Sequence, residues 1–339
     1  MGLKENITIL AIETSCDETS VAVMENGREI RANIISSQIE DHQVFGGVVP
    51  EIASRLHLES INGIIDAALR EAKISFSDLD AVAVTKGPGL VGAILVGVSA
   101  AKAISLSLGI PLLGVNHMQG HICANYIAYP ELEPPFVSLV VSGGHSYLIE
   151  VLDYTSYIIH GRTRDDAAGE CFDKVARTLG LGYPGGPQID RLYFAGNPQA
   201  IEFPRVIIDK QTYDFSFSGL KTAVINYVHQ HRQKGQPIVI ADVAASFQQA
   251  VIDVLVDKSF RLLDTLGYDK LVVSGGVAAN RGLRDAMATR ASKTNTQVLF
   301  PPIVLCTDNA AMIGCQGYYD YLGGRESDLA MRVYPNLSL

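Results

Sequence analysis

The sequence has little of what would mark a nucleic-acid-binding or a disordered protein. It contains no tryptophan, and only 19% of its 339 residues are charged, while 47% are hydrophobic. It has no basic excess, because 27 Lys and Arg stand against 36 Asp and Glu, a formal net charge of −9. This composition is typical of a globular protein of about two domains. Binding to RNA would therefore need a local basic patch or a basic partner.

Paired cysteine motifs and long apolar runs are also missing. The five cysteines are dispersed and form no C-x-x-C pair, which excludes a zinc ribbon and a thioredoxin-type motif. An odd, dispersed set favours reduced thiols in the cytoplasm. The apolar run 7–12 is too short for a signal peptide or a membrane span. Because Gly or polar residues interrupt the other apolar runs, we expect no membrane association.

One six-residue string occurs twice. Residues 139–144 and 271–276 both read Leu-Val-Val-Ser-Gly-Gly. Such an apolar run predicts a buried strand that leads into a tight turn. Glycines at a strand end let backbone N–H groups approach a phosphate closely. A P-loop is absent, and we expect no classical Rossmann site.

A looser version of this pattern opens the chain. Residues 7–12 and 20–24 predict two strands around a polar turn at 13–19, and 146–151 predicts a hairpin partner for the first Ser-Gly-Gly copy. The remaining segments alternate: we expect helices over 56–73, 90–107, 243–267 and 310–322, and strands over 81–85 and 111–115. Three prolines within 130–135 mark a domain boundary. We expect an N-terminal domain of residues 1–130 with about 309–339, and a C-terminal domain of 131–308.

This arrangement resembles the two-lobed α/β architecture of actin, Hsp70 and the sugar kinases. The resemblance implies duplicated mixed-sheet domains with an adenine nucleotide held between them by two phosphate hairpins. A later strand with a Gly-Gly turn would lie against the adenosine.

A pair of histidines follows a predicted strand. Asn116 is a suitable cap for a helix that begins at His117, and His121 then lies one turn further along the same face. Two histidines at this spacing favour a metal site, although a pair of surface histidines is the simpler alternative. A zinc protease is disfavoured, because Met118 replaces the glutamate that an H-E-x-x-H motif needs as its general base.

A third metal ligand is available at Asp308, which we place at a strand-to-helix junction. Its simpler role is to cap the helix that follows, but its carboxylate would complete a two-histidine, one-carboxylate site with open positions. Asp173 is a candidate ribose ligand or the helix partner of Arg177. Further candidate contacts to a nucleotide come from the 183–187 loop and from Asp190 and Asn280.

With these motifs assembled, the chain resembles the TsaD family, also called YgjD or Gcp, with Kae1 relatives in archaea and eukaryotes. The resemblance rests on the bacterial-type turn Glu-Thr-Ser-Cys-Asp-Glu-Thr at 13–19, on Gly-Gly-Val-Val-Pro-Glu at 46–51, on 85–90 and on 215–222. It covers nearly the whole chain. It implies transfer of a threonylcarbamoyl group from threonylcarbamoyl-AMP to N6 of adenosine 37 in tRNAs that read codons starting with A, with release of AMP.

The resemblance also implies a set of functional residues and partners. It implies that one Fe²⁺ or Zn²⁺ is bound by His117, His121 and Asp308. It also implies a bound adenine nucleotide, which is threonylcarbamoyl-AMP, with ATP or ADP as further possible ligands. The implied partners are tRNA, a noncatalytic TsaB-like paralogue and a small TsaE-like P-loop ATPase. Asp17 is our candidate general acid or base, with a turn-stabilising role as the alternative. The implied nucleotide contacts are Val140, Val141, Ser142, Gly143, Gly144, Asp173, Gly186, Asp190 and Asn280.

Three other classes of function compete with a transferase. An ATP-dependent kinase or ATPase of the same fold would bind Mg²⁺ through carboxylates and would not need the histidine pair. A noncatalytic scaffold would have lost the metal residues, which are present here. A metalloendopeptidase, an old label for the family, is disfavoured by Met118.

Overall fold

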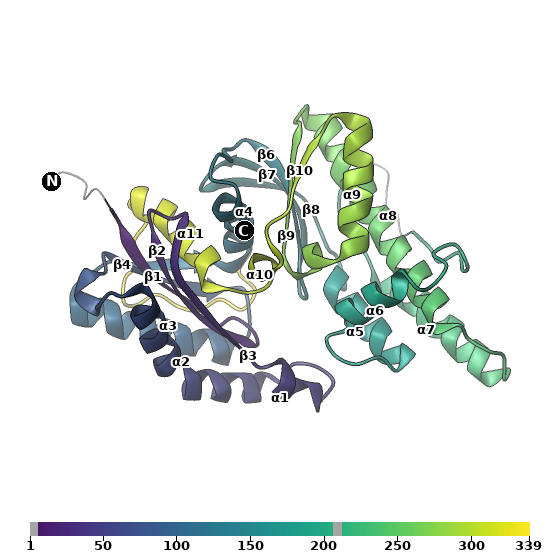
Figure 1. The fold of residues 1–339 in the computed structure, drawn as a ribbon, viewed down its shortest axis with the longest axis horizontal. Helices are drawn as coiled ribbons and strands as arrows, with labels where there is room; N and C mark the ends of the chain where they lie inside the picture. Colours follow the sequence, from purple (N-terminus) through teal and green to yellow (C-terminus); the bar gives the residue numbers. More distant parts are fainter. Residues whose placement is uncertain (1–5, 206–211) are drawn as a thin grey trace. The chain divides into compact units, whose positions relative to one another are not determined.

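The structure is a computed structural model that describes residues 6–205 and 212–339. The chain forms two compact units. The first comprises residues 1–133, 153–156 and 301–339, and the second comprises 134–152 and 157–300. Residues 301–308, which the sequence division assigned to the C-terminal domain, therefore belong to the first unit. Figure 1 shows the helices and strands of both units.

The first unit is built on a five-stranded mixed sheet in the order β3-β2-β1-β4-β5. β1 pairs antiparallel with β2 and parallel with β4, and β5 extends the parallel part. Its strands are β1 (Thr8–Glu13), β2 (Glu18–Glu25), β3 (Glu29–Ser37), β4 (Ala81–Gly87) and β5 (Leu112–Asn116). Its helices are α1 (Ile39–Gln43), α2 (Pro50–Ala72), η1 (Phe76–Asp78), α3 (Val91–Leu108), α4 (His117–Ala128), α10 (Ile303–Cys306) and α11 (Ala310–Leu322).

Helices cover both faces of this sheet. Successive residues of each strand point to opposite faces and therefore pack against different helices. Leu10 and Ile12 of β1 pack with α2 and α3 in one apolar cluster. Ile9 and Ala11 pack with α4 and α11 in the other. The helix that carries the histidine pair and the helix that follows Asp308 therefore cover the same face.

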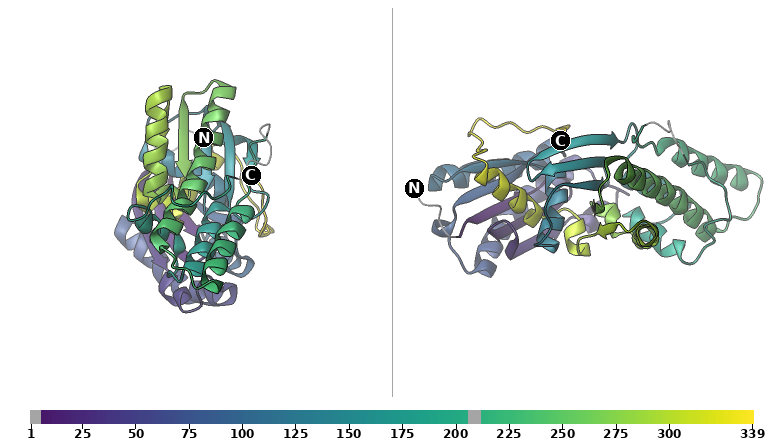
Figure 2. Two further views of the ribbon diagram at one scale, coloured as in Figure 1. Left: turned by 90° about the vertical axis from the view of Figure 1, so that its right-hand side faces the viewer. Right: turned by 90° about the horizontal axis from the view of Figure 1, so that it is seen from above.

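The second unit repeats the topology of the first. Its sheet has the order β10-β9-β6-β7-β8, so that β6 to β10 occupy the places of β1 to β5. Figure 2 gives two further views of the helices that accompany it. The strands are β6 (Phe136–Val141), β7 (Ser146–Asp153), β8 (Ser156–Arg162), β9 (Lys270–Ser274) and β10 (Gln297–Leu299). The helices are α5 (Ala168–Leu179), α6 (Gly185–Tyr193), α7 (Ser218–Gln233), α8 (Ile240–Leu266), η2 (Gly276–Ala279) and α9 (Arg281–Thr294).

The duplication is real, but it differs from the one that the repeated string indicates. The two Leu-Val-Val-Ser-Gly-Gly copies lie on β6 and β9, which are adjacent parallel strands of one sheet. Leu139 pairs with Val273, and Val140 pairs with Ser274. Because both strands are parallel, both Ser-Gly-Gly turns leave the same edge of the second unit. The counterpart of the first copy in the other unit is the β1–β2 hairpin.

Most predicted elements are confirmed, with shifts at their ends. The helix expected over 56–73 begins earlier, at Pro50, which occupies the first helical turn after Val49. The apolar pattern did not reveal this first turn, because Glu51 is exposed and adds no apolar residue to the pattern. The predicted junction before Asp308 is wrong, since 303–306 forms the short helix α10 and not a strand.

One helix is apolar enough to qualify as a membrane span by length and composition. It is α3, whose 18 residues have a mean hydropathy of 1.8. The sequence led us to expect Gly, charged or polar residues within every apolar run, and α3 contains Gly92, Gly97 and Lys102. Core helices pass the same test, and α3 packs against α2 and β4 within the first unit. The hydropathy of α3 is therefore weak evidence for a span.

Candidate metal centre

The predicted cap places both histidines. Asn116 ends β5, and its Oδ1 accepts a hydrogen bond of 2.9 Å from the N–H of Met118. This is the N-cap interaction expected from the sequence, and α4 begins at His117 as predicted. His117 and His121 then lie one turn apart on α4, with ring centroids separated by 4.6 Å.

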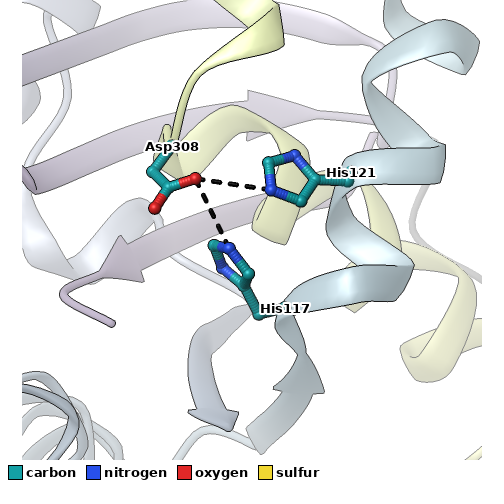
Figure 3. A group of neighbouring side chains, drawn as sticks. All are labelled: His117, His121 and Asp308. Carbon is teal, nitrogen blue, oxygen red and sulfur yellow. Dashed lines mark ion pairs between the residues drawn. The ribbon is translucent and has the colours of Figure 1, made fainter. Parts of the chain in front are cut away.

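Asp308 reaches the histidine pair from the loop between α10 and α11. The cap of α11 is Asn309, whose Oδ1 accepts from the N–H of Met312 at 3.1 Å. The default role predicted for Asp308 is therefore taken by its neighbour, and its carboxylate is available for another role. Figure 3 shows the carboxylate of Asp308 pointing at both imidazole rings.

The spacing of these three side chains matches the size of a metal site. The Nε2 atoms of His117 and His121 each lie 3.4 Å from Oδ1 of Asp308. All three ligand atoms lie within 4.8 Å of one another. Metal–ligand bonds of about 2.1 Å, at angles between octahedral and tetrahedral, place ligand atoms roughly 3.0–3.5 Å apart. The structure therefore brings together the three residues that the sequence singled out as metal ligands.

Burial supports the same interpretation. His121 is fully buried, and neither of its ring nitrogens makes a hydrogen bond within the described residues. A buried, unsatisfied polar atom costs on the order of 1–3 kcal/mol, which a metal bound at Nε2 would offset. The Asp308 side chain is 21% exposed, so the site has one side open for a further ligand.

Glu13 is the functional residue that sequence reasoning missed. It is fully buried at the end of β1, and its Oε2 lies 2.9 Å from Nδ1 of His117. Thr85 Oγ1 donates to the same carboxylate at 2.5 Å, and the backbone N–H of Ser15 donates to the other oxygen. A carboxylate on Nδ1 fixes the ring and leaves Nε2 for a metal. The one available signal was a glutamate directly after four apolar strand residues.

The pKa values of Asp308, His117 and His121 depend on one another. Burial raises the pKa of Asp308, but the charge of His117 and the contacts with both imidazoles outweigh it and hold the pKa below its usual range. Burial lowers the pKa of His117, whereas Asp308 and Glu13 raise it well above its ordinary value. Burial and the charge of His117 lower the pKa of His121. Without a metal, one imidazolium therefore lies between two carboxylates.

The Asp17 turn lies close to this charge cluster. Asp17 is buried between β1 and β2, and its carbonyl accepts a hydrogen bond of 2.9 Å from the N–H of Gln38. Burial, with the charges of Asp17 and Asp308, raises the pKa of Glu18 to about 10. Glu18 therefore holds a proton at neutral pH, next to the carboxylate that we selected as an acid or base.

The predicted nucleotide residues lie together in the second unit. Val140 and Val141 end β6, and Ser142 follows the strand, where its N–H donates to the carbonyl of His145 across the hairpin. A Cβ atom at Gly143 or Gly144 would meet nothing within 4 Å, so the space next to both glycines is open. The N–H of Glu170 in α5 donates to the carbonyl of Gly143 at 2.9 Å, which ties the turn to that helix.

Asp173 connects α5 to the next part of the cluster. Its Oδ1 accepts a hydrogen bond of 2.7 Å from the N–H of Gly185, which lies beside Gly186 in the first turn of α6. Asp173 therefore fixes the 183–187 loop.

Asp190 and Asn280 are joined by a residue that the sequence did not reveal. Gln248 of α8 is fully buried, and it donates to Asp190 at 2.8 Å and accepts from Asn280 at 2.9 Å. Asn280 also caps α9 through the N–H of Leu283. Asp190 accepts from the backbone N–H of Arg281 as well. Both carboxylate oxygens of Asp190, and both the amide oxygen and the amide nitrogen of Asn280, thus have hydrogen bonds within the second unit.

Comparison with known proteins agrees with this fold and shows the family of the chain. Residues 29–315 match the family described as "TsaD: tRNA N6-adenosine threonylcarbamoyltransferase". A protein of that name from Clostridioides difficile is 55% identical over 98% of this chain and 99% of its own length. One from Clostridium botulinum is 55% identical over 99% of both chains.

Solved structures of low sequence identity share the fold. HypF, solved in a phosphate- and nucleotide-bound form, gives a TM-score of 0.64 at 15% identity, over 93% of this chain and 46% of HypF. Component A of the (R)-2-hydroxyglutaryl-CoA dehydratase of Acidaminococcus fermentans gives 0.54 at 15% identity, over 93% of this chain and 99% of that protein.

The fold and the site together define a duplicated α/β enzyme of the actin, Hsp70 and sugar-kinase class with a candidate metal centre in its first unit. Within that class, the chain belongs to the TsaD family of tRNA N6-adenosine threonylcarbamoyltransferases. It is therefore a transferase that modifies tRNA.

Proposed function

We propose that this chain transfers the threonylcarbamoyl group of threonylcarbamoyl-AMP to N6 of adenosine 37, in tRNAs that read codons starting with A. The N6 lone pair attacks the carbamoyl carbonyl, the mixed-anhydride bond between the carbonyl carbon and the phosphate oxygen breaks, and AMP leaves with the bonding electrons. The observation that carries the proposal is the convergence of His117, His121 and Asp308 on one point. A bound Fe²⁺ or Zn²⁺ would supply Lewis-acid and template chemistry at that point.

The residues of the chain have distinct tasks in this proposal. An adenine amine is a weak nucleophile, because its lone pair is delocalised into the ring, so positioning carries much of the catalysis. Glu13 orients His117, and the Ser-Gly-Gly turn of β6 presents backbone N–H groups to the leaving phosphate. Asp17 would accept the N6 proton. Asp173 and Gly186, with Asp190 and Asn280, would contact the nucleoside.

Binding to tRNA is proposed to depend on partners. The net charge is −9, and two basic side chains that could contact a phosphate backbone, Arg164 and Lys221, are neutralised locally. Arg164 pairs with Asp214 at 2.7 Å, and Lys221 pairs with Asp166 at 2.5 Å. We therefore propose that a noncatalytic paralogue of the same fold and a small P-loop ATPase complete the cytoplasmic enzyme.

A single-turnover assay tests the reaction. The protein and its two proposed partners are mixed with tRNA and preformed threonylcarbamoyl-AMP, and the tRNA nucleosides are analysed by mass spectrometry. We expect N6-threonylcarbamoyladenosine with the parent protein, and at least a 100-fold lower rate with Asp308→Ala. Unmodified adenosine under all conditions would exclude the proposed transfer. Phosphorylation of an added acceptor by ATP would favour a kinase of the same fold instead.

A further inference from the structure

The last residues of the chain follow an extended course along the first unit. Residues 328–339 contain neither helix nor strand and are drawn in yellow, ending at the label C (Figure 2). The backbone of Ser327 bonds to Leu112 of β5, and Lys102 of α3 donates to the carbonyl of Met331 at 2.7 Å. The segment is thus attached to the body of the unit before it reaches the metal centre.

The segment then crosses the loop between β4 and α3. The N–H of Tyr334 donates to Lys86 at 2.8 Å, and the N–H of Gly89 donates to Pro335 at 3.1 Å. Gly87 has a φ of 147°, and a Cβ there would collide with the carbonyl of Tyr334. Gly87 therefore admits the segment to this loop.

The same loop contains a glycine motif, although we expected no classical Rossmann site from the sequence. Gly87, Gly89 and Gly92 have the G-x-G-x-x-G spacing of a dinucleotide fingerprint, between a strand and a helix. In this chain the space beside Gly87 is filled by Tyr334, and the space beside Gly89 is filled by Ser15. Gly87 and Gly89 therefore serve close packing of the chain on itself.

The segment ends on the cap of the metal-binding helix. Asn116 is 5% exposed, and its Nδ2 donates to the carbonyl of Ser338 at 2.9 Å. Its Oδ1 is the cap of α4, whose first residue is His117. A single amide group therefore joins the end of the chain to the first turn that carries a metal ligand.

A second connection reaches the same histidine from the other side. The N–H of Leu90, next to Gly89, donates to the carbonyl of Ser15 at 2.8 Å. The hydroxyl of Ser15 lies 3.2 Å from Nδ1 of His117. The segment thus holds both the cap of α4 and the turn whose hydroxyl contacts its first histidine.

We propose that residues 334–338 are part of the framework of the metal centre, and that Asn116 is the positioning residue through which they orient His117. The inference rests on the metal centre of the proposed function. It does not place these residues in contact with substrate. Ligand positions have to be held to within about 0.5 Å, and losing a partner that orients a metal ligand costs 10- to 100-fold in affinity.

Two variants separate the segment from the cap. Deletion of residues 334–339 removes the carbonyl of Ser338 and leaves Asn116 intact. Asn116→Ser keeps a good N-cap oxygen but loses the donor to Ser338. Zn²⁺ affinity is measured by competition with a chromogenic chelator, and hydrogen exchange reports on the first-turn amides of α4 without metal. Each variant should weaken Zn²⁺ binding about tenfold and speed that exchange.

The double variant gives the sharpest result. Because both changes break the same hydrogen bond between Asn116 and Ser338, the double variant should bind Zn²⁺ no more weakly than the deletion alone. Ser75→Ala, which removes the remote cap of η1, is the control for general destabilisation and should leave the affinity within twofold. Unchanged affinity and exchange in both single variants would overturn the proposal, and so would fully additive losses. His117→Ala should abolish Zn²⁺ binding by the parent protein. If the parent protein bound no Zn²⁺, or if this variant bound it equally well, the metal centre and the proposed function would both be wrong.

Discussion

The carboxylate of Glu13 decides how the metal-binding histidine is presented. It lies behind His117 and is itself held by Thr85 and the N–H of Ser15. Losing a ligand-orienting carboxylate of this kind typically costs about 10- to 100-fold in metal affinity. A neutral amide in the same place would retain the shape but lose the charge that favours a proton on Nδ1.

Glu13→Gln is therefore expected to weaken Zn²⁺ binding 10- to 100-fold while the protein stays folded. Chelator competition measures the affinity, and urea unfolding measures the stability. Glu25→Gln, which removes a carboxylate paired with Arg31 at the edge of the sheet, is the matched control and should not change the affinity. Equal affinities for Glu13→Gln and the parent protein would show that Glu13 has no orienting role.

Protons should compete with the metal at His117. Its pKa lies well above the ordinary value of 6.5, because Asp308 and Glu13 outweigh the effect of burial. Between pH 6.5 and that raised pKa, metal binding should release about one proton, so Zn²⁺ affinity should fall as the pH is lowered. Calorimetry in buffers of different ionisation enthalpy counts the protons.

The same shift affects the stability of the metal-free protein. A raised pKa in the folded state means that protonated His117 stabilises the fold below pH 6.5, and that this contribution is lost as the pH rises through the raised value. Chelator-treated protein should accordingly lose stability in that window, and His117→Gln should not. A parent protein whose metal-free stability rises with pH there would contradict the charge assignment.

At the scale of the elements, two asparagine caps position the two candidate sites. Asn309 caps α11 next to Asp308 in the first unit, and Asn280 caps α9 next to Gln248 in the second. Each cap is worth about 1 kcal/mol of stability. Both residues are N-caps, but Asn309 lies beside a candidate metal ligand and Asn280 lies beside a candidate nucleotide contact.

Replacing each cap by alanine should give opposite functional results. Asn309→Ala should lower stability by about 1 kcal/mol and weaken Zn²⁺ binding severalfold, with AMP binding unchanged. Asn280→Ala should weaken AMP binding and leave Zn²⁺ binding unchanged. Titration calorimetry with each ligand measures both, and the two variants serve as controls for each other. If both variants affected both ligands equally, the assignment of separate sites would be wrong.

The sequence predicted elements well where a local rule determines them. The helix at His117 and the helix over 310–322 begin at asparagine caps, which are short-range signals. The placement of the repeated string was less predictable, because two identical strands give no information on which strands they pair with. Glu13 and Gln248 could not be found in the sequence, since their partners are distant and their burial depends on packing of the whole unit.

At the scale of the molecule, acidity is the property that most constrains function. A chain of net charge −9 repels the tRNA backbone, and ion pairs within the chain already neutralise Arg164 and Lys221. The isolated chain should therefore bind tRNA weakly, and its affinity should rise at least tenfold when the proposed partners are added. Filter binding at a fixed salt concentration measures this. Tight binding by the isolated chain would remove the need for partners.

The central claim is that one metal ion is held by His117, His121 and Asp308 in the first unit. Anomalous X-ray diffraction at the zinc edge, from crystals grown with Zn²⁺, tests it directly. The account predicts one strong peak about 2.0–2.2 Å from Nε2 of both histidines and from Oδ1 of Asp308. Anomalous density elsewhere with none at these three atoms would contradict it.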